Sequence, residues 1–170
     1  MWSGDVAVRV LEALAQRSET LATAESLTGG LLAARITDVP GASRSFVGGV
    51  VSYATRVKVA ALDVPEALVE RYGVVSRECA LAMADGVRDR LDATWGLATT
   101  GVAGPDEQDG QPVGTVWVAV AGPSGTDARL LALAGDRAAI RAATCDAVLA
   151  DLAARLRDVE VFAREEGPLG

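Results

Sequence analysis

The segment that most constrains the fold runs from residue 20 to residue 38. Thr20 to Glu25 is a short β-prone run, Ser26 and Thr28 bring hydroxyl groups, and Gly29 and Gly30 stand at the start of a helical pattern over residues 28–38. A strand that passes through a tight turn into a helix is typical of sheets covered by helices. Such a turn can also hold a nucleophilic hydroxyl or bind an anion.

The remaining patterns predict a single α/β domain. Helices are expected at 5–17, 28–38, 55–62, 65–73, 77–90 and from 136 onward, and strands at 20–25, 46–53, 95–100, 114–121 and 128–134. This order predicts a three-layer α/β/α sandwich with a mixed sheet and a hairpin-rich second half. We expect one domain over residues 1–163 and a flexible tail over residues 164–170.

Composition narrows the class of protein. Half of the 170 residues are apolar and only 4% are aromatic, so we expect a core built mainly from Ala, Val and Leu. The formal net charge is −7 without any basic run, which disfavours nucleic-acid and anionic-membrane partners. With no signal-type segment after the N-terminus and no apolar run approaching ~18 residues, the protein is expected in the cytoplasm.

Metal and disulfide chemistry are not expected. The chain has no histidine, and its two cysteines, Cys79 and Cys145, fall in helical patterns without a CxxC spacing. We predict that both are reduced packing residues. The acidic residues Asp106, Glu107 and Asp109 miss the spacing of a calcium-binding loop, so no metal and no cofactor are predicted.

Two interpretations fit the turn after the first strand. Ser26 could be a nucleophile, with free N–H groups of the following helix as its oxyanion site, or Ser26 or Thr28 could simply cap that helix while Gly29 and Gly30 allow close packing. If the strand geometry persists, the side chains of Glu25 and Ser26 point to opposite sides. Only one of them can then face a shared pocket.

Without histidine, an activated serine needs another base, and the chain contains one lysine, Lys58. It lies five residues after Tyr53, near the third position of a helix that Thr55 is expected to cap. The helix dipole there lowers the pKa of a lysine only slightly. A general base needs a pKa far below the reference of about 10.4, so burial and a second cation would have to contribute. An ordinary exposed lysine is the alternative.

Two further segments could line a binding site. The loop from Thr99 to Asp106 is rich in small residues that let a ligand approach the backbone, although it could equally be a plain connection between strands. Arg137 and Arg141 lie four residues apart at the start of the last helix, a placement that suits a phosphate. The alternative is a solvated helix face capped by Asp136.

Taken together, six motifs resemble the C-terminal domain family of the competence/damage-inducible protein CinA, whose stand-alone members include nicotinamide-nucleotide amidases (PncC). The resemblance runs from about residue 5 to residue 157, in the family's order and spacing. The motifs are Ala24 to Gly30 (AESLTGG), Gly49 to Lys58 (GVVSYATRVK), Gly73 to Ser76 (GVVS), Thr100 to Pro105 (TGVAGP), Pro112 to Trp117 (PVGTVW) and Gly135 to Arg137 (GDR).

The resemblance implies an α/β/α fold and metal-free hydrolysis of nicotinamide mononucleotide to nicotinate mononucleotide and ammonia. It implies Ser26 as the nucleophile, Lys58 as its base and Tyr53 as a support for the pair. Substrate contacts are expected from the Ser26 turn, from the loop after the third strand and from one of the two arginines, which the sequence does not rank. These residues are Thr28, Gly29, Gly30, Thr100, Gly101, Arg137 and Arg141. A homodimer or larger homo-oligomer is also expected.

Two departures from the family pattern affect these expectations. Leu27 stands where the family often has a smaller residue, so it could narrow the pocket or pack beneath the turn. The larger N-terminal domain of full-length CinA proteins does not occur in this sequence, and we expect any activity that depends on it to be missing. Two other hypotheses are a nucleotide-binding or assembly module without catalysis, and a Ser-Lys hydrolase for another small amide.

Overall fold

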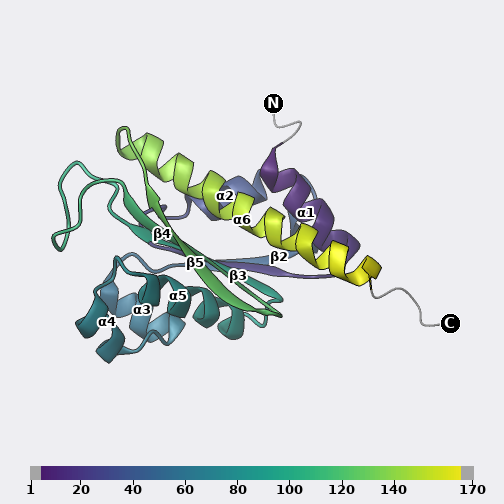
Figure 1. The fold of residues 1–170 in the computed structure, drawn as a ribbon, viewed down its shortest axis with the longest axis horizontal. Coiled ribbons are helices and arrows are strands. Elements are labelled where there is room, and N and C mark those ends of the chain that lie inside the picture. The colour runs from purple at the N-terminus through teal and green to yellow at the C-terminus, as the bar shows by residue number, and fades with distance from the viewer. Residues whose placement is uncertain (1–4, 166–170) are drawn as a thin grey trace.

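A five-stranded mixed sheet lies between two layers of helices in the computed structural model, which describes residues 5–165 (Figure 1). The strand order is β2-β1-β3-β4-β5. Strand β1 is parallel to both β2 and β3, whereas β4 runs antiparallel to β3 and to β5. The predicted three-layer α/β/α architecture is therefore confirmed.

The order of helices and strands is also the predicted one, with a short 3-10 turn, η1, added before β2. The strands are β1 Leu21–Glu25, β2 Phe46–Val51, β3 Trp95–Gly101, β4 Thr115–Gly122 and β5 Gly125–Ala132. The helices are α1 Val6–Gln16, α2 Leu31–Thr37, η1 Ala42–Arg44, α3 Thr55–Leu62, α4 Glu66–Tyr72, α5 Arg77–Arg90 and α6 Arg137–Glu165.

Most boundaries lie within two residues of the prediction, and three differences have a structural reason or bear on the site. Strand β5 begins three residues earlier because Pro123 and Ser124 form a tight two-residue connection, which lets Gly122 pair with Gly125. Helix α6 continues to Glu165, so the first two residues of the predicted flexible tail are helical. Residues 166–170 of that tail lie outside the described residues. The third difference, at the start of α2, bears on the site.

Helix α2 begins at Leu31 rather than at residue 28 because a carboxylate from the preceding strand takes the place of a cap. Glu25 accepts hydrogen bonds from the backbone N–H groups of Leu32 at 2.8 Å and Ala33 at 3.1 Å. Gly29 and Gly30 have positive φ angles of 57° and 99°, which turn the chain before the helix starts. Neither Ser26 nor Thr28 caps α2, so the capping interpretation of these hydroxyls is wrong.

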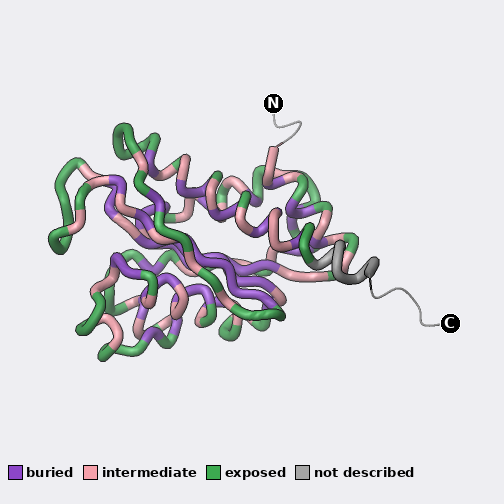
Figure 2. Tube along the Cα trace, viewed as in Figure 1, coloured by how far each residue is buried: buried purple, intermediate pink, exposed green. Residues whose placement is uncertain are grey.

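The two faces of the sheet carry side chains of different size. The face that packs against α1, α2 and α6 presents large residues, and the face toward α3, α4 and α5 presents alanines (Figures 1 and 2). Leu97 and Ala98 of β3 illustrate this alternation, which follows from the two-residue period of a strand. The core is dominated by Ala, Val and Leu, as expected.

The small face lets α5 approach the sheet and α3 approach α5. A Cβ atom on Gly96 of β3 would lie 2.3 Å from the carbonyl oxygen of Ala84 in α5. A Cβ atom on Gly86 of α5 would lie 2.0 Å from the carbonyl oxygen of Leu62, at the end of α3. Glycine at these two positions therefore sets the distance between α3 and the rest of the domain.

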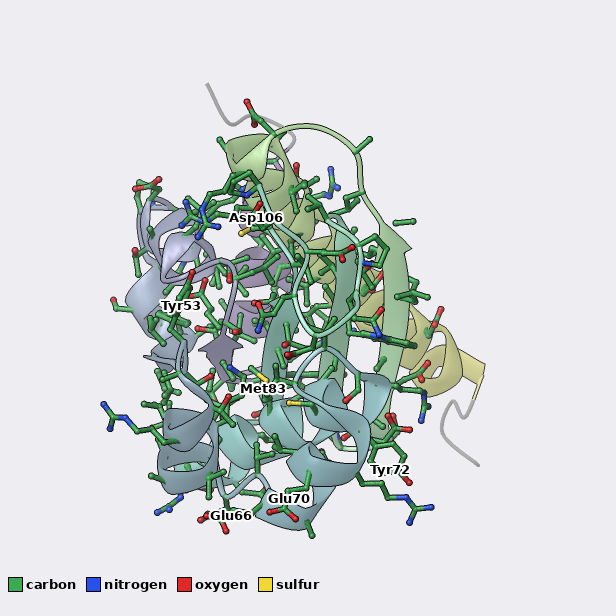
Figure 3. All side chains as sticks on the ribbon, turned by 90° about the vertical axis from the view of Figure 1, so that its left-hand side faces the viewer. Tyr53, Glu66, Glu70, Tyr72, Met83 and Asp106 are labelled. Carbon is green, nitrogen blue, oxygen red and sulfur yellow. The ribbon has the colours of Figure 1, made fainter. Side chains whose placement is uncertain are left out.

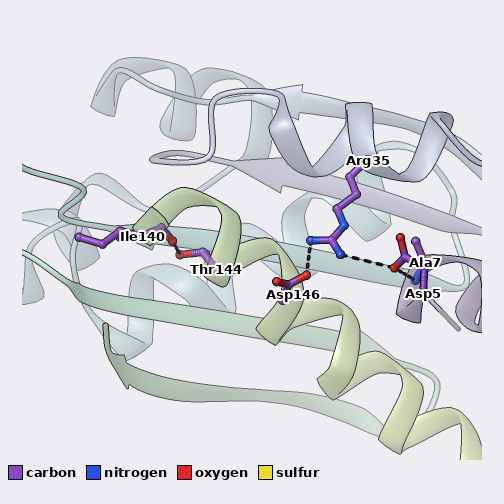
Figure 4. Close-up of polar contacts among 6 residues, drawn as sticks. All are labelled: Asp5, Ala7, Arg35, Ile140, Thr144 and Asp146. Carbon is purple, nitrogen blue, oxygen red and sulfur yellow. Dashed lines mark hydrogen bonds and ion pairs between the residues drawn. The ribbon is translucent and has the colours of Figure 1, made fainter. Parts of the chain in front are cut away.

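The opposite layer is tied together by charged side chains (Figure 4). Arg35 of α2 pairs with Asp146 of α6 and lies 3.4 Å from Asp5, whose carboxylate also caps α1 through the N–H group of Ala7 at 3.0 Å. These contacts fix α6 against α2 and α1. They thereby hold the helix whose first turns reach the candidate site.

Both cysteines are free and buried, Cys79 in α5 and Cys145 in α6, which confirms that they are packing residues. Over residues 5–165, no helix combines the length and the apolar character needed to cross a membrane.

We predict that Gly86→Ala destabilises the domain. Helix propensity alone predicts a gain of about 1 kcal/mol for alanine over glycine, but the added methyl group meets the Leu62 carbonyl and should cost about 1–3 kcal/mol. Urea denaturation measures the sign directly. A variant more stable than the wild type would contradict the close packing of α3 on α5.

Candidate active site

The predicted site residues follow the carboxyl ends of three neighbouring parallel strands. Ser26 comes directly after β1, Ser52 and Tyr53 come after β2, and Val102 comes after β3. Because β1 lies between β2 and β3 and is parallel to both, these segments meet at one edge of the sheet. This edge is the usual ligand-binding position in open α/β sheets.

A pocket with a cavity volume of about 170 Å³ opens at this edge. Figure 3 faces this end of the molecule and labels Tyr53 and Asp106, which line the pocket from the segments after β2 and β3. Residues from α3, α6 and the segment before α5 complete the wall. The lining residues are Ser26, Leu27, Tyr53, Thr55, Lys58, Val74, Val75, Thr100, Gly101, Val102, Ala103, Gly104, Asp106, Gln108 and Arg137.

The Ser26 hydroxyl and the Lys58 amine are in direct contact at the base of this pocket. Lys58 Nζ lies 3.0 Å from Ser26 Oγ and donates hydrogen bonds to the backbone carbonyls of Ser52 at 2.6 Å and Tyr53 at 3.4 Å. The Lys58 side chain is only 1% exposed. The two carbonyls and the hydroxyl offer three acceptors to Nζ, and the hydroxyl can also donate its proton to the lone pair of a neutral amine.

The end of β2 and the start of α3 place this amine. The Ser52 N–H donates to the carbonyl of Glu25 at 2.8 Å, which aligns the end of β2 with the end of β1. Helix α3 then starts at Thr55 with Ala54 as its cap, so the expected capping role of Thr55 is wrong and Lys58 is the fourth helical residue. As predicted, Glu25 and Ser26 point to different sides, toward α2 and toward Lys58 respectively.

Burial is the main cause that lowers the pKa of Lys58 from its ordinary value of 10.5, rather than the helix end. The neighbouring thiolate of Cys79 would oppose this shift, but burial raises the pKa of that thiol to about 11, so the thiol is neutral near pH 7. No ion pair joins Lys58 to a carboxylate within the described part of the chain. The environment therefore favours the neutral amine.

The phenol of Tyr53 is not part of the Ser26–Lys58 pair. Its hydroxyl accepts a hydrogen bond from Arg137 at 3.0 Å, and only its backbone carbonyl faces Lys58. Tyr53, expected as a support for the pair, contacts Lys58 through its main-chain carbonyl. Arg137 also donates to the Gly104 carbonyl at 2.7 Å, so its guanidinium bridges the segments that follow β2 and β3.

Four predicted substrate-binding residues do not line the pocket. The Thr28 hydroxyl is buried against the hydroxyl of Thr99 at 2.8 Å, and Gly29 and Gly30 form the bend that leads into α2. Arg141 donates to backbone carbonyls of the Ser26 turn. Although Arg137 and Arg141 share a helix face, only Arg137 reaches the pocket, together with the predicted Thr100 and Gly101.

The expected oxyanion site at the start of α2 is also wrong. The first N–H groups of that helix are occupied: Leu31 donates to the carbonyl of Thr28, and Leu32 and Ala33 donate to Glu25. Leu27 packs in the core cluster, where it is 4% exposed, and it also borders the pocket.

Sequence reasoning missed several residues of the wall. The loop from Thr99 to Asp106 was expected as a possible pocket wall, but Asp106 was not itself predicted as a site residue, and its side chain was weighed only as a metal ligand. The sequence carries no signal for Gln108. Val74 and Val75 join the pocket wall because of a tertiary contact, in which the Thr100 hydroxyl donates to the Val74 carbonyl at 2.7 Å.

Comparison with known proteins agrees with the motifs around this pocket. The family model described as the CinA C-terminal domain matches residues 4–156. The chain belongs to the CinA C-terminal domain family. All the residues that line the pocket, from Ser26 to Arg137, fall within the matched residues.

The relatives of this CinA C-terminal domain include much longer proteins. A CinA-like protein from Frankia casuarinae is 62% identical over 132 residues, which cover 78% of this chain but 30% of that protein. A CinA-like protein from Gemmatimonas aurantiaca is 44% identical over 164 residues, which cover 96% of this chain and 37% of that protein. The chain thus spans about a third of the length of these relatives.

Solved structures of CinA proteins share the fold. A CinA superfamily protein from Klebsiella pneumoniae superposes with a TM-score of 0.88 at 31% identity, covering 91% of this chain and 97% of the other. A competence/damage-inducible protein from Agrobacterium tumefaciens gives a TM-score of 0.86 at 33% identity, with coverages of 90% and 94%. The open mixed sheet of this CinA C-terminal domain is therefore the one found in solved family structures.

The buried amine predicts a pH-dependent stability. Between the lowered pKa of Lys58 in the folded state and the ordinary value of 10.5, the unfolded chain binds a proton that the folded chain does not. The free energy of unfolding should then rise with pH, by up to about 1.4 kcal/mol per pH unit. Lys58→Met removes this contribution.

The measurement is the free energy of unfolding of wild type minus that of Lys58→Met, from urea denaturation between pH 7 and pH 10. Taking the difference cancels groups that titrate equally in both proteins. We expect the difference to increase with pH. A flat or falling difference would mean that Lys58 is charged in the folded protein.

Proposed function

We propose that the protein is an amidohydrolase that converts nicotinamide mononucleotide to nicotinate mononucleotide and ammonia through an acyl-enzyme on Ser26. The observation that carries the proposal is the contact of 3.0 Å between Ser26 Oγ and the buried amine of Lys58, in a pocket of a CinA C-terminal domain. A serine next to a neutral amine can be activated without histidine or a metal.

The reaction begins with the neutral Lys58 amine, which takes the hydroxyl proton of Ser26 as Oγ attacks the carboxamide carbon. The C–O bond forms and the carbonyl electrons move to oxygen. Lys58 then gives the proton to the amide nitrogen, the C–N bond breaks and ammonia leaves. Water, activated by the same amine, hydrolyses the nicotinoyl ester and restores Ser26.

The charges of the pocket wall favour a zwitterionic substrate. Among the residues that line the pocket, Arg137 carries an exposed guanidinium group and Asp106 is the one acidic residue. Nicotinamide mononucleotide carries an anionic phosphate and a cationic pyridinium. Arg137 keeps N–H donors beyond those given to Gly104 and Tyr53, which suits the phosphate. A pyridinium beside Lys58 further disfavours the protonated amine.

We predict that Ser26→Ala and Lys58→Met each reduce ammonia release from nicotinamide mononucleotide by at least about 10³-fold, since each removes a group that no other residue replaces. Lys58→Arg should be equally inactive, because arginine keeps the charge but cannot act as a base near neutral pH. Ammonia is measured together with the thermal shift that the nucleotide causes.

Ser124→Ala, in the distant turn between β4 and β5, is the control and should retain wild-type turnover. Normal turnover by the Ser26 or Lys58 variants would refute the mechanism. A wild-type protein that shows a thermal shift without ammonia would be a nucleotide-binding module. Ammonia from other small amides but not from the nucleotide would indicate a different substrate.

A second prediction concerns the phosphate. Arg137→Ala should raise KM for nicotinamide mononucleotide by about 10- to 100-fold, the effect of losing charged hydrogen bonds, and should raise KM for nicotinamide riboside much less. Arg71→Ala, on the exposed surface of α4, serves as a charge-matched control. Equal increases in KM for nucleotide and riboside would reject the phosphate role of Arg137.

A further inference from the structure

Arg141 holds the main chain of the turn that carries Ser26. It projects from α6 one turn after Arg137, and its Nε donates to the Leu27 carbonyl at 3.1 Å. Its second guanidinium nitrogen donates to the Thr28 carbonyl at 2.7 Å. The guanidinium therefore holds the carbonyls of the two residues that follow Ser26, and we call this pair of contacts the clamp. Arg141 itself does not line the pocket.

This clamp fixes the direction of the amide groups as well as the carbonyls. In a trans peptide unit the N–H group points opposite to the C=O group of the same plane. The Leu27 carbonyl points at Arg141, so the Thr28 N–H points away from it. The Ser26 carbonyl accepts a hydrogen bond from the Gly29 N–H at 3.0 Å, and this contact sets the direction of the Leu27 N–H.

Leu27, Thr28 and Gly30 carry the N–H groups of the turn that have no acceptor within residues 5–165, and the first two of these directly follow Ser26. The N–H groups of Ser26, Gly29 and Leu31 all donate to backbone carbonyls. Leu27 borders the pocket beside Ser26. An amide directly after a nucleophile is well placed to stabilise a developing oxyanion.

We infer that Arg141 is a positioning residue that orients the Leu27 and Thr28 amides as the oxyanion site for attack by Ser26. The inference rests on the proposed Ser26 chemistry and replaces the direct phosphate contact expected of Arg141. The clamp acts only through the turn, so its loss weakens stabilisation of the transition state and leaves ground-state binding of the nucleotide largely intact.

The first test compares Arg141→Ala and Arg141→Lys with the wild type, using nicotinamide mononucleotide and its thioamide counterpart. Arg141→Ala should lower kcat about 10²-fold with little change in KM, the effect of one lost oxyanion donor. Arg141→Lys should recover part of this loss, since an ammonium can still hold one carbonyl. Sulfur accepts hydrogen bonds poorly, so the preference for oxygen over sulfur should shrink in Arg141→Ala.

Arg155→Ala provides a matched control. Arg155 also lies on α6 and donates to two backbone carbonyls, those of Val120 and Gly125, each at 2.9 Å, but it is remote from the pocket. If only the hydrogen bonds from α6 to neighbouring backbone carbonyls mattered, Arg141→Ala and Arg155→Ala should lower the thermal stability by similar amounts. Only Arg141→Ala should change kcat and the oxygen-to-sulfur preference.

The second test separates this inference from the choice of substrate. A fluorophosphonate probe reacts with an activated serine through a tetrahedral phosphorus centre, whichever amide the protein hydrolyses. We expect Arg141→Ala to slow labelling of Ser26 about 10²-fold relative to the wild type and to Arg155→Ala. Slower labelling without any wild-type ammonia release would keep the inference and reject the nucleotide as substrate.

Three results would overturn the inference. The first is an unchanged labelling rate in Arg141→Ala. The second is a rise in KM for the nucleotide with kcat and the oxygen-to-sulfur preference unchanged, which would make Arg141 a phosphate contact. The third is the absence of labelling at Ser26 in the wild type, which would reject the proposed chemistry together with the positioning role.

Discussion

The burial of the Lys58 amine against Ser26 is the constraint on which the rest of this structure depends. Removing an ammonium group from water is costly unless a counter-charge accompanies it, and no carboxylate pairs with Lys58 within the described residues. The amine instead meets the carbonyls of Ser52 and Tyr53 and the Ser26 hydroxyl. These partners supply hydrogen bonds but no counter-charge, so burial lowers the pKa of Lys58 and favours the neutral amine.

The fold turns the carboxylate next to Ser26 away from the Lys58 amine. The acidic residue nearest in sequence to Ser26 is its neighbour Glu25, which is 1% exposed and turned toward α2, where two N–H groups hold it. Glu25 therefore stabilises the start of α2 instead of stabilising the charged form of Lys58. The Glu25 carboxylate also occupies N–H groups in the first turn of α2. The proposed oxyanion donors therefore come from the turn before the helix, at Leu27 and Thr28.

Local patterns were sufficient for the architecture, but for Ser26 and Lys58 they left alternatives open, and only the family resemblance paired the two residues. Two-residue and 3.6-residue periods predicted the order of strands and helices, and the turn and the lone lysine pointed to Ser26 and Lys58 before their contact of 3.0 Å was known. The start of α2 could not be predicted, because the group that caps it is a strand residue seven positions before Leu32 rather than a residue at the helix end.

The remaining site residues depend on tertiary structure. Spacing places Arg137 and Arg141 on one helix face, but one guanidinium reaches across to Tyr53 and Gly104 while the other reaches the Ser26 turn. Val74 joins the pocket because Thr100 holds its carbonyl, a contact between residues 26 positions apart. Sequence spacing does not determine the direction of a long side chain or the neighbours of a connecting segment.

The proposed mechanism needs a Lys58 amine whose pKa burial has lowered in the folded protein. Because the chain has one lysine, labelling with lysine enriched in ¹³C at Cε gives one side-chain signal by NMR that needs no assignment by mutation. A pH titration of that signal in the folded protein measures the pKa of the amine directly. We expect a midpoint well below the ordinary 10.5, and a midpoint at or above that value would mean that burial does not lower the pKa of Lys58.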